Sequence, residues 1–186
     1  MSRMTILPTG IDGLYVIEPL LHGDERGYFT ETYNQRDFHA LGLDMTFVQD
    51  NESMSRKGVL RGLHYQIAHP QGKLVRALQG AVYDVAVDLR PGSVTYGKWY
   101  GVELSHHNHR MFYIPEGFAH GYLTLSDTAV FAYKVTDFYH PGDEGGLRWN
   151  DPAIGVIWPG VEGERMDDGT PLILNERDRN WPLRDD

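Results

Sequence analysis

Short stretches rich in Val, Tyr, Phe and Thr recur along the chain, and Gly and Pro separate them. Within residues 81–89 the residues alternate with a period of two, as in a strand. One face of that strand is then apolar and suited to a core, and the other is small and acidic, with Asp84, Ala86 and Asp88. Similar stretches occupy residues 27–33, 59–66, 74–79, 99–104, 111–115 and 129–137. The pattern predicts an all-β sandwich or barrel.

A short helix and a long tail complete the predicted organisation. The helix spans residues 35–41, near the N-terminal third, because Asn34 can cap its start and Gly42 can end it. Residues 160–186 are loop-like, with Gly, Pro and acidic residues, but they include the apolar run 171–174 and Trp181. We expect this tail to pack back on the body of the protein.

Length and composition narrow the class of protein. The chain has 186 residues without a low-complexity break, so we expect one domain over residues 1–186. No apolar run approaches the roughly 20 residues that span a bilayer, and the first residues lack a secretory apolar region, which predicts a soluble, cytoplasmic protein. The absence of cysteine excludes disulfides, thiol nucleophiles and sulfur-ligated metals. A net charge of −9 opposes binding to nucleic acid.

Basic side chains stand along two of the predicted strands. The stretch GVLRGLHYQ at residues 58–66 is followed by QGKLVR at residues 71–76, and these stretches contain Arg61, His64, Lys73 and Arg76. Burying unpaired charge in a strand is costly. We therefore predict a pocket for an anionic, reactive small molecule.

The candidate site combines His64, His120, Lys73, Tyr133 and one carboxylate. Such groups can remove a proton, hold a developing oxyanion and return a proton from another direction, which suits proton transfer next to a carbonyl. Taken singly, each has a simpler structural interpretation. A strand histidine is more often a hydrogen-bonded packing residue, and a strand tyrosine is usually part of the core.

The sequence argues against a metal at this site. Residues 62–66 (GLHYQ) and 115–120 (PEGFAH) look like the two half-motifs of a cupin, a double-sheet jelly roll that often binds a metal. A metal-binding cupin has a second histidine where Gln66 stands, and the stretch 71–79 lacks its acidic ligand and contains Lys73. The histidines at positions 106, 107 and 109 are typical of an exposed turn. We expect no metal and no other cofactor.

Seven ordered blocks resemble those of the dTDP-4-dehydrorhamnose 3,5-epimerases, cofactor-free cupin enzymes that act on nucleotide-linked 4-keto-6-deoxy sugars. The resemblance runs nearly from end to end. Its blocks are residues 23–27 (GDERG), 47–51 (FVQDN), 60–64 (LRGLH), 71–76 (QGKLVR), 84–88 (DVAVD), 114–121 (IPEGFAHG) and 149–152 (WNDP).

The resemblance implies a role for each catalytic candidate. His64 would be the base that removes a hydrogen beside the C4 ketone, and Lys73 would stabilise the enolate oxygen. Tyr133 would be the acid that reprotonates the opposite face, and Asp178 would orient His64. The family commonly has Ser and Lys at positions 175 and 177, where this chain has Asn and Arg, so Asp84 stays a rival partner of His64. Asp84 could instead form a second dyad with His120.

The resemblance also implies a set of substrate contacts, with Tyr139 stacking on the base and two arginines, Arg26 and Arg61, clamping the diphosphate. Strict alternation from His64 would put Arg61 on the other face of its strand, so either Gly62 makes a bulge or Arg61 reaches the ligand from an edge. Simple ion pairs are the alternative for both arginines. The implied contacts are Arg26, Glu31, Gln49, Asn51, Arg61, His120, Tyr139, Glu144 and Arg177.

Three functions remain open on these grounds. The first is epimerisation of dTDP-4-dehydro-6-deoxy-D-glucose at both C3 and C5, to give dTDP-4-dehydro-L-rhamnose. The second is a single-site epimerase of related dTDP-4-keto-6-deoxy sugars, and the third is a non-catalytic cupin that binds sugar nucleotides. We expect a homodimer, with neither a nucleic acid nor a membrane as partner.

Overall fold

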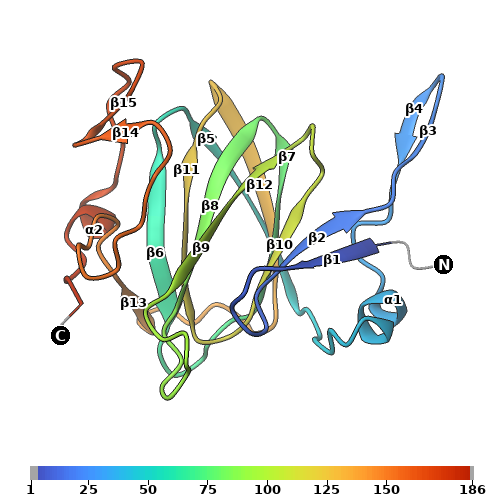
Figure 1. The fold of residues 1–186 in the computed structure, drawn as a ribbon, viewed down its shortest axis with the longest axis horizontal. Coiled ribbons are helices and arrows are strands. Elements are labelled where there is room, and N and C mark those ends of the chain that lie inside the picture. The colour runs from blue at the N-terminus through green and yellow to red at the C-terminus, as the bar shows by residue number, and fades with distance from the viewer. Residues whose placement is uncertain (1–3, 185–186) are drawn as a thin grey trace.

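The computed structural model describes residues 4–184, and nearly all of its regular structure is antiparallel β-sheet (Figure 1). One sheet has six strands, in the order β1 (Met4–Pro8), β2 (Tyr15–Pro19), β10 (Met111–Ile114), β7 (Lys73–Gln79), β12 (Thr128–Val135) and β5 (Gln49–Arg56). The other has five, in the order β13 (Glu144–Gly146), β6 (Leu60–Gln66), β11 (Phe118–Thr124), β8 (Ala81–Asp88) and β9 (Trp99–Ser105). This arrangement confirms the predicted double-sheet jelly roll.

Two small hairpins and two short helices decorate this sandwich. The hairpin β3 (His22–Asp24) and β4 (Gly27–Phe29) projects from the N-terminal side, and β14 (Val161–Glu162) pairs with β15 (Arg165–Met166) in the C-terminal segment (Figure 1). The helices are α1 (Gln35–Ala40) and α2 (Glu176–Arg179). Between residues 4 and 184, neither helix is long and apolar enough to cross a membrane.

The predicted helix is confirmed as α1. The side chain of Asn34 accepts a hydrogen bond from the backbone N–H of Arg36 at 3.2 Å, and Gly42 follows the end of the helix with a φ of +80°. Phe38 is fully buried and packs with Ile17 and Leu74 on the outer face of the six-stranded sheet.

The main core lies between the two sheets. The inner face of the six-stranded sheet contributes Val75, Phe112 and Phe131, and the five-stranded sheet contributes Val82 and Ala86. Asp84 and Asp88 share that inner face of β8 and are completely buried. The face predicted to be acidic is therefore an interior face.

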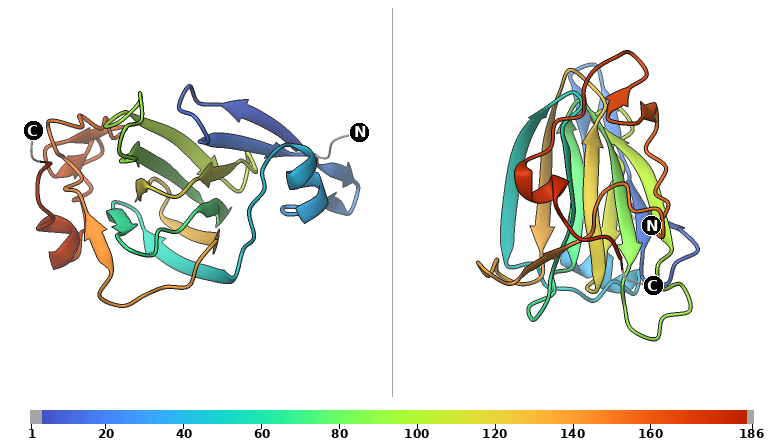
Figure 2. Two further views of the ribbon diagram at one scale, coloured as in Figure 1. Left: turned by 90° about the horizontal axis from the view of Figure 1, so that it is seen from below. Right: turned by 90° about the vertical axis from the view of Figure 1, so that its left-hand side faces the viewer.

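The C-terminal segment covers the opposite face of β8, as expected for a tail that packs back. Val85 and Val87 lie in a second core with Trp149, Trp158 and Leu172. The indole N–H of Trp158 donates to the carbonyl of Trp149 at 2.9 Å. Figure 2 shows this segment lying along the five-stranded sheet, on the side away from the N-terminal strands. Both faces of β8 are thus buried.

An irregularity in β6 decides which way Arg61 points. His64 lies opposite His120 and Arg61 opposite Tyr122, so β6 has one more residue than β11 between these pairs. The extra residue restores Arg61 to the inner face that His64 occupies, which confirms the bulge that we considered at Gly62. Gly62 has a φ of +131°, and a Cβ there would lie 2.5 Å from the Cα of Gly121.

Sequence analysis missed five strands of the two large sheets, β1, β2, β5, β11 and β13, and the sequences of β5 and β11 show why. Strand β5 has the sequence QDNESMSR, which lacks the apolar alternation of a half-buried strand. Strand β11 is buried along its whole length and contains Gly121 and His120, so it shows no alternation either. The helix α2 was also missed, because residues 160–186 were expected to be loop-like.

Replacing Gly62 tests the close approach of β6 and β11. We expect Gly62→Ala to lower the free energy of unfolding by at least about 2 kcal/mol more than Gly169→Ala, because only the former forces a methyl group against backbone. Gly169 is the matched control, since it also has a positive φ, +84°, but a Cβ added there would have no atom within 4 Å. Urea denaturation measures both. Equal losses in the two variants would contradict a tight contact at Gly62.

Candidate active site

A pocket opens between the two sheets and collects most of the predicted site residues. Strands β6 and β11 of one sheet and β7 and β12 of the other contribute to its walls. Eight predicted residues line it, namely His64, Lys73, Tyr133, Arg61, His120, Tyr139, Glu144 and Arg177. Arg76, which we expected near these groups, points to the outer side of β7 with Leu74.

The imidazole of His64 is held by a carboxylate from the C-terminal helix. Its Nε2 lies 2.6 Å from Oδ1 of Asp178, and Asp178 is only 1% exposed. The other oxygen, Oδ2, accepts from the backbone N–H of Gly62 at 3.3 Å. Because a carboxylate only accepts hydrogen bonds, Nε2 of His64 carries the proton, and Nδ1 is the basic atom.

Local sequence explains why Asp178 reaches His64. Asn175 caps α2, and its side-chain oxygen accepts from the backbone N–H of Asp178 at 2.6 Å. Burial opposes ionisation of Asp178, but the hydrogen bond and charge of His64, with the Gly62 amide, hold the pKa of Asp178 below its usual value. The carboxylate is therefore charged at neutral pH and fixes the orientation of the His64 ring.

A second histidine–carboxylate pair lies beside the first. Nε2 of His120 is 2.9 Å from Oδ1 and 3.0 Å from Oδ2 of Asp84. Burial lowers the pKa of His120 and raises that of Asp84, while the attraction between the two acts against both shifts. The structure thus pairs Asp84 with His120, and His64 with Asp178.

Lys73 contributes a positive charge to the lining of the pocket. Burial lowers the pKa of Lys73 to about 8, and the charge of Asp84 opposes that shift. The ammonium is still mostly protonated at neutral pH, yet it sits where water shields it poorly. Such a group interacts strongly with an oxyanion that forms next to it.

Tyr133 faces the histidines from the other sheet. It follows Phe131 by two residues on β12, so both side chains reach the pocket. Burial raises the pKa of Tyr133, Tyr122 raises it further, and Arg61 acts in the opposite direction. The phenol therefore stays protonated at neutral pH and can act as an acid.

Hydrogen bonds at the pocket wall connect the two sheets. The hydroxyls of Ser53 and Tyr122 lie 3.0 Å apart, and Nε of Arg61 donates to the hydroxyl of Ser55 at 3.1 Å. Ser53, on the unpredicted strand β5, and Tyr122 line the pocket without having been expected there. These bonds orient Arg61 along the wall.

The helix α2, the short strand β13 and the segment after β12 also contribute to the pocket lining. Arg177 forms an ion pair with Glu144, and its guanidinium lies 5.7 Å from the ring centroid of Trp181. Tyr139 lies at the rim, where its backbone N–H donates to Oε1 of Gln49 at 3.2 Å.

Gln49 also donates to Oδ1 of Asn51 at 2.8 Å. The two predicted amide contacts therefore lie next to pocket residues: Gln49 bonds to the backbone of Tyr139, and Asn51 lies opposite Tyr133 in the sheet.

Two predicted contacts lie elsewhere in the chain. Arg26 occupies the turn of the β3–β4 hairpin, pairs with Asp24, and has a side chain that is 84% exposed. Glu31 follows that hairpin and accepts from the side-chain amide of Asn34 at 3.4 Å. Figure 1 shows the hairpin on the side of the sandwich opposite β6 and β13. A single chain does not bring these residues to the pocket.

Sequence analysis also overlooked two glutamines as pocket residues. Gln66 is 8% exposed and donates from Nε2 to the carbonyl of His140 at 2.9 Å, and Gln71 donates to the carbonyl of Asp137 at 2.8 Å. Both line the pocket and anchor the segment that carries Tyr139. The sequence signal that could have identified them is their position, because Gln66 lies two residues after His64 and Gln71 lies two residues before Lys73.

Comparison with known sequences gives one consistent family. The family model described as dTDP-4-dehydrorhamnose 3,5-epimerase matches residues 8–186. A dTDP-4-dehydrorhamnose 3,5-epimerase from Methanothermobacter thermautotrophicus is 55% identical over 186 residues, which cover 100% of this chain and 97% of the relative.

Solved structures agree with the sequence comparison. The dTDP-6-deoxy-D-glucose-3,5-epimerase of Legionella pneumophila, in complex with dTDP-4-keto-L-rhamnose, matches with a TM-score of 0.89 and 50% identity, over 97% of this chain and 92% of that one. A 3'-monoepimerase from Streptomyces bikiniensis, in complex with dTDP-quinovose, matches with a TM-score of 0.83 and 34% identity, over 95% and 86% of the two chains.

The burial of Lys73 has a measurable consequence. We expect one lysine side-chain NMR signal to titrate with a midpoint near pH 8, and to be missing from Lys73→Met. An unfolded lysine titrates near pH 10.4, so between about pH 8 and pH 10.4 the unfolded state binds more protons. The free energy of unfolding of the wild type, relative to Lys73→Met, should then rise with pH.

Lys134→Met is the matched control, because Lys134 pairs with Asp50 on the outer side of the six-stranded sheet. It should keep the signal that titrates near pH 8. A Lys73 signal that titrates above pH 10 would contradict burial of this ammonium.

Proposed function

Because this chain belongs to the dTDP-4-dehydrorhamnose 3,5-epimerase family, we propose that it converts dTDP-4-dehydro-6-deoxy-D-glucose to dTDP-4-dehydro-L-rhamnose. The enzyme inverts C3 and C5 of the sugar, as an isomerase in dTDP-rhamnose biosynthesis. The observation that carries the proposal is the placement of a base and an acid on facing sheets. His64 comes from β6, Tyr133 comes from β12, and both line one pocket.

Inversion begins at the hydrogen beside the C4 ketone. Nδ1 of His64 takes that proton, and the pair of electrons moves into an enolate whose oxygen is the former ketone oxygen. Asp178, hydrogen-bonded to Nε2, stabilises the imidazolium that results. A positioned base of this kind contributes roughly 10²–10⁴-fold to the rate.

Reprotonation from the other side completes the inversion. The hydroxyl of Tyr133 delivers a proton to the carbon, on the face turned away from His64, and the ketone forms again. While the enolate exists, the positive charge of Lys73 balances the negative charge on its oxygen. Before the second carbon reacts, water takes the proton from the His64 imidazolium and returns one to the Tyr133 phenolate. The same groups can then serve C3 and C5 in turn, and the ketone supplies the activation, so the proposal needs no cofactor.

The remaining pocket residues are proposed to hold the nucleotide. Arg61 offers a guanidinium for the diphosphate, which it binds through paired charge-assisted hydrogen bonds. Tyr139 is placed at the rim to stack on the thymine. His120, Glu144 and Arg177 contact the substrate from the walls, and Gln49 and Asn51 from the segment beside Tyr139.

A single-site epimerase is the main alternative, since the 3'-monoepimerase of Streptomyces bikiniensis has a similar structure. The same base, acid and lysine would serve it, and only the placement of the sugar would differ. A non-catalytic binding protein is disfavoured, because binding alone needs neither the His64–Asp178 pair nor a half-buried lysine with a lowered pKa.

The outlying position of Arg26 supports a homodimer. Arg26 is a proposed diphosphate contact, yet it lies on a hairpin with two exposed aromatic rings, Tyr28 at 61% and Phe29 at 65%. A second copy of the chain would cover these rings and receive Arg26 and Glu31 at its own pocket. A two-fold dimer satisfies both requirements with one reciprocal contact.

We further propose that residues 1–186 act as one cupin-like domain. The contact of Asp178 with His64 supports this, because the C-terminal segment completes the site. A cytoplasmic location fits a substrate that is a soluble nucleotide sugar, and neither nucleic acid nor membrane takes part.

Deuterium exchange separates the roles of the base and the acid. In deuterium oxide the wild type should place deuterium at both C3 and C5 of dTDP-4-dehydro-6-deoxy-D-glucose, with inversion at both. His64→Asn should abolish the exchange, because nothing else removes the proton. Tyr133→Phe should retain exchange but suppress inversion, as the opposite-face donor is gone. Proton NMR and mass spectrometry follow the label.

The outcomes discriminate between the alternatives. His107→Asn, at an exposed position outside the pocket, is the control and should behave as the wild type. Label at one carbon only would make the protein a single-site epimerase, and no label from a protein that binds dTDP would favour the binding module. Exchange retained in folded His64→Asn would refute the base assignment.

Mixing two inactive variants tests the shared site. Arg26→Ala lacks the hairpin arginine and His64→Asn lacks the base, so each homodimer should be nearly inactive. Random exchange of subunits should restore about a quarter of the wild-type activity, because half of the dimers then contain one complete site. Activity that stays at the sum of the separate variants, in a mixture shown to have exchanged subunits, would rule out a partner contribution.

A further inference from the structure

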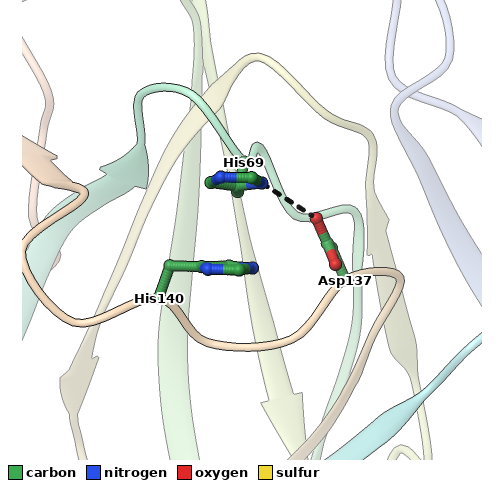
Figure 3. A group of neighbouring side chains, drawn as sticks. All are labelled: His69, Asp137 and His140. Carbon is green, nitrogen blue, oxygen red and sulfur yellow. Dashed lines mark ion pairs between the residues drawn. The ribbon is translucent and has the colours of Figure 1, made fainter.

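Two histidines and an aspartate gather beside the pocket mouth, where sequence analysis predicted nothing. His69 lies in the loop after β6, and Asp137 and His140 lie in the segment after β12. The two imidazole rings stack with centroids 3.8 Å apart and an interplanar angle of 15°. Nδ1 of His69 is 3.7 Å from Oδ2 of Asp137, and one donor atom from each residue lies within 4.8 Å of the others (Figure 3).

The backbone around these side chains is held in place by hydrogen bonds between the two segments. The carboxylate of Asp143 accepts from the N–H groups of Ala68 at 2.9 Å and of His69 at 2.8 Å, and these bonds lower the pKa of Asp143. Gln66 and Gln71 bond to the carbonyls of His140 and Asp137. The three side chains therefore extend from anchored backbone, and only side-chain rotation is needed to direct their ligand atoms at one ion.

The donor set selects a class of ion. Imidazole nitrogen and carboxylate oxygen suit Zn²⁺, Ni²⁺ and Cu²⁺, whereas Mg²⁺ and Ca²⁺ need a shell of oxygens. Metal–nitrogen bonds of about 2.0–2.1 Å place the donors of a tetrahedral site roughly 3.3 Å apart. The side chain of His69 is 48% exposed, so its ring can rotate out of the stack and close the remaining gap.

We propose that His69, Asp137 and His140 form a binding site for a transition-metal ion, separate from the proton-transfer site. Tyr139 lies between two of the ligands in sequence and lines the pocket. A bound ion joins the loop after β6 to the segment after β12, and so restrains the segment that presents Tyr139. The proposal stands on the cluster alone and does not depend on the reaction in the pocket.

Metal titration of the full, untagged chain tests the site. Isothermal titration with Zn²⁺ and with Ni²⁺ should show one ion per chain, and His69→Gln and His140→Gln should each weaken binding by more than about tenfold. His107→Gln is the matched control. The rings of His106 and His107 also lie close together, with centroids 3.7 Å apart and a tilt of 39°, but the described residues place no carboxylate with them in a metal-binding group.

Hydrogen exchange locates the bound ion. Zn²⁺ should slow amide exchange in the peptide that covers residues 137–143 of the wild type, and should leave the same peptide of His69→Gln unchanged. Three results would overturn the proposal: no binding at millimolar ion, binding that depends on His107 and not on His69, or protection confined to other peptides. Activity of the enzyme enters none of these measurements.

Discussion

The hydrogen bond between His64 and Asp178 joins residues 114 positions apart, and it links the pocket to the C-terminal segment. Asp178 reaches the histidine only because the tail lies against the outer face of the five-stranded sheet, where Trp149, Trp158 and Leu172 cover Val85 and Val87. Apolar burial thus positions the carboxylate that holds His64. The cap at Asn175 and the amide of Gly62 then fix its position, so the charge is buried without being left unpaired.

The same constraint governs the rest of the pocket. Asp84 sits on the inner face of β8, between apolar neighbours, and it is tolerable there because His120 bonds it and Lys73 lies close enough to be attracted. Removing one member of such a group leaves another charge unpaired, which costs more than the pair itself contributes. The pocket residues therefore stabilise each other as a set. Apolar residues of similar volume in place of such buried charged groups are often neutral or stabilising, so stability alone does not account for these groups.

The sequence predicted the parts of the fold that local pattern determines. The helix α1 was found through its cap and its terminal glycine, and β8 through its alternation, because those signals act within a few residues. Strand β5 escaped because its inward residues are polar where they meet the pocket, and α2 because four residues carry no periodicity. The family resemblance pointed to Asp178, although no local rule places it beside His64. The strand predicted over residues 27–33 is confirmed only as far as Phe29, where β4 ends.

The two-sheet architecture explains why this fold suits inversion of a carbon centre. Sheets that pack face to face lie about 10 Å apart, so a ligand in a pocket between them is within reach of side chains from both sheets. His64 and Lys73 lie on different sheets, as do His64 and Tyr133. In the proposed reaction, a planar enolate between them would therefore meet the proposed base on one face and the proposed acid on the other. Each of these strands also contributes to the core, with Val75 near Lys73 and Phe131 near Tyr133. The rigid core therefore fixes the distance between the base and the acid.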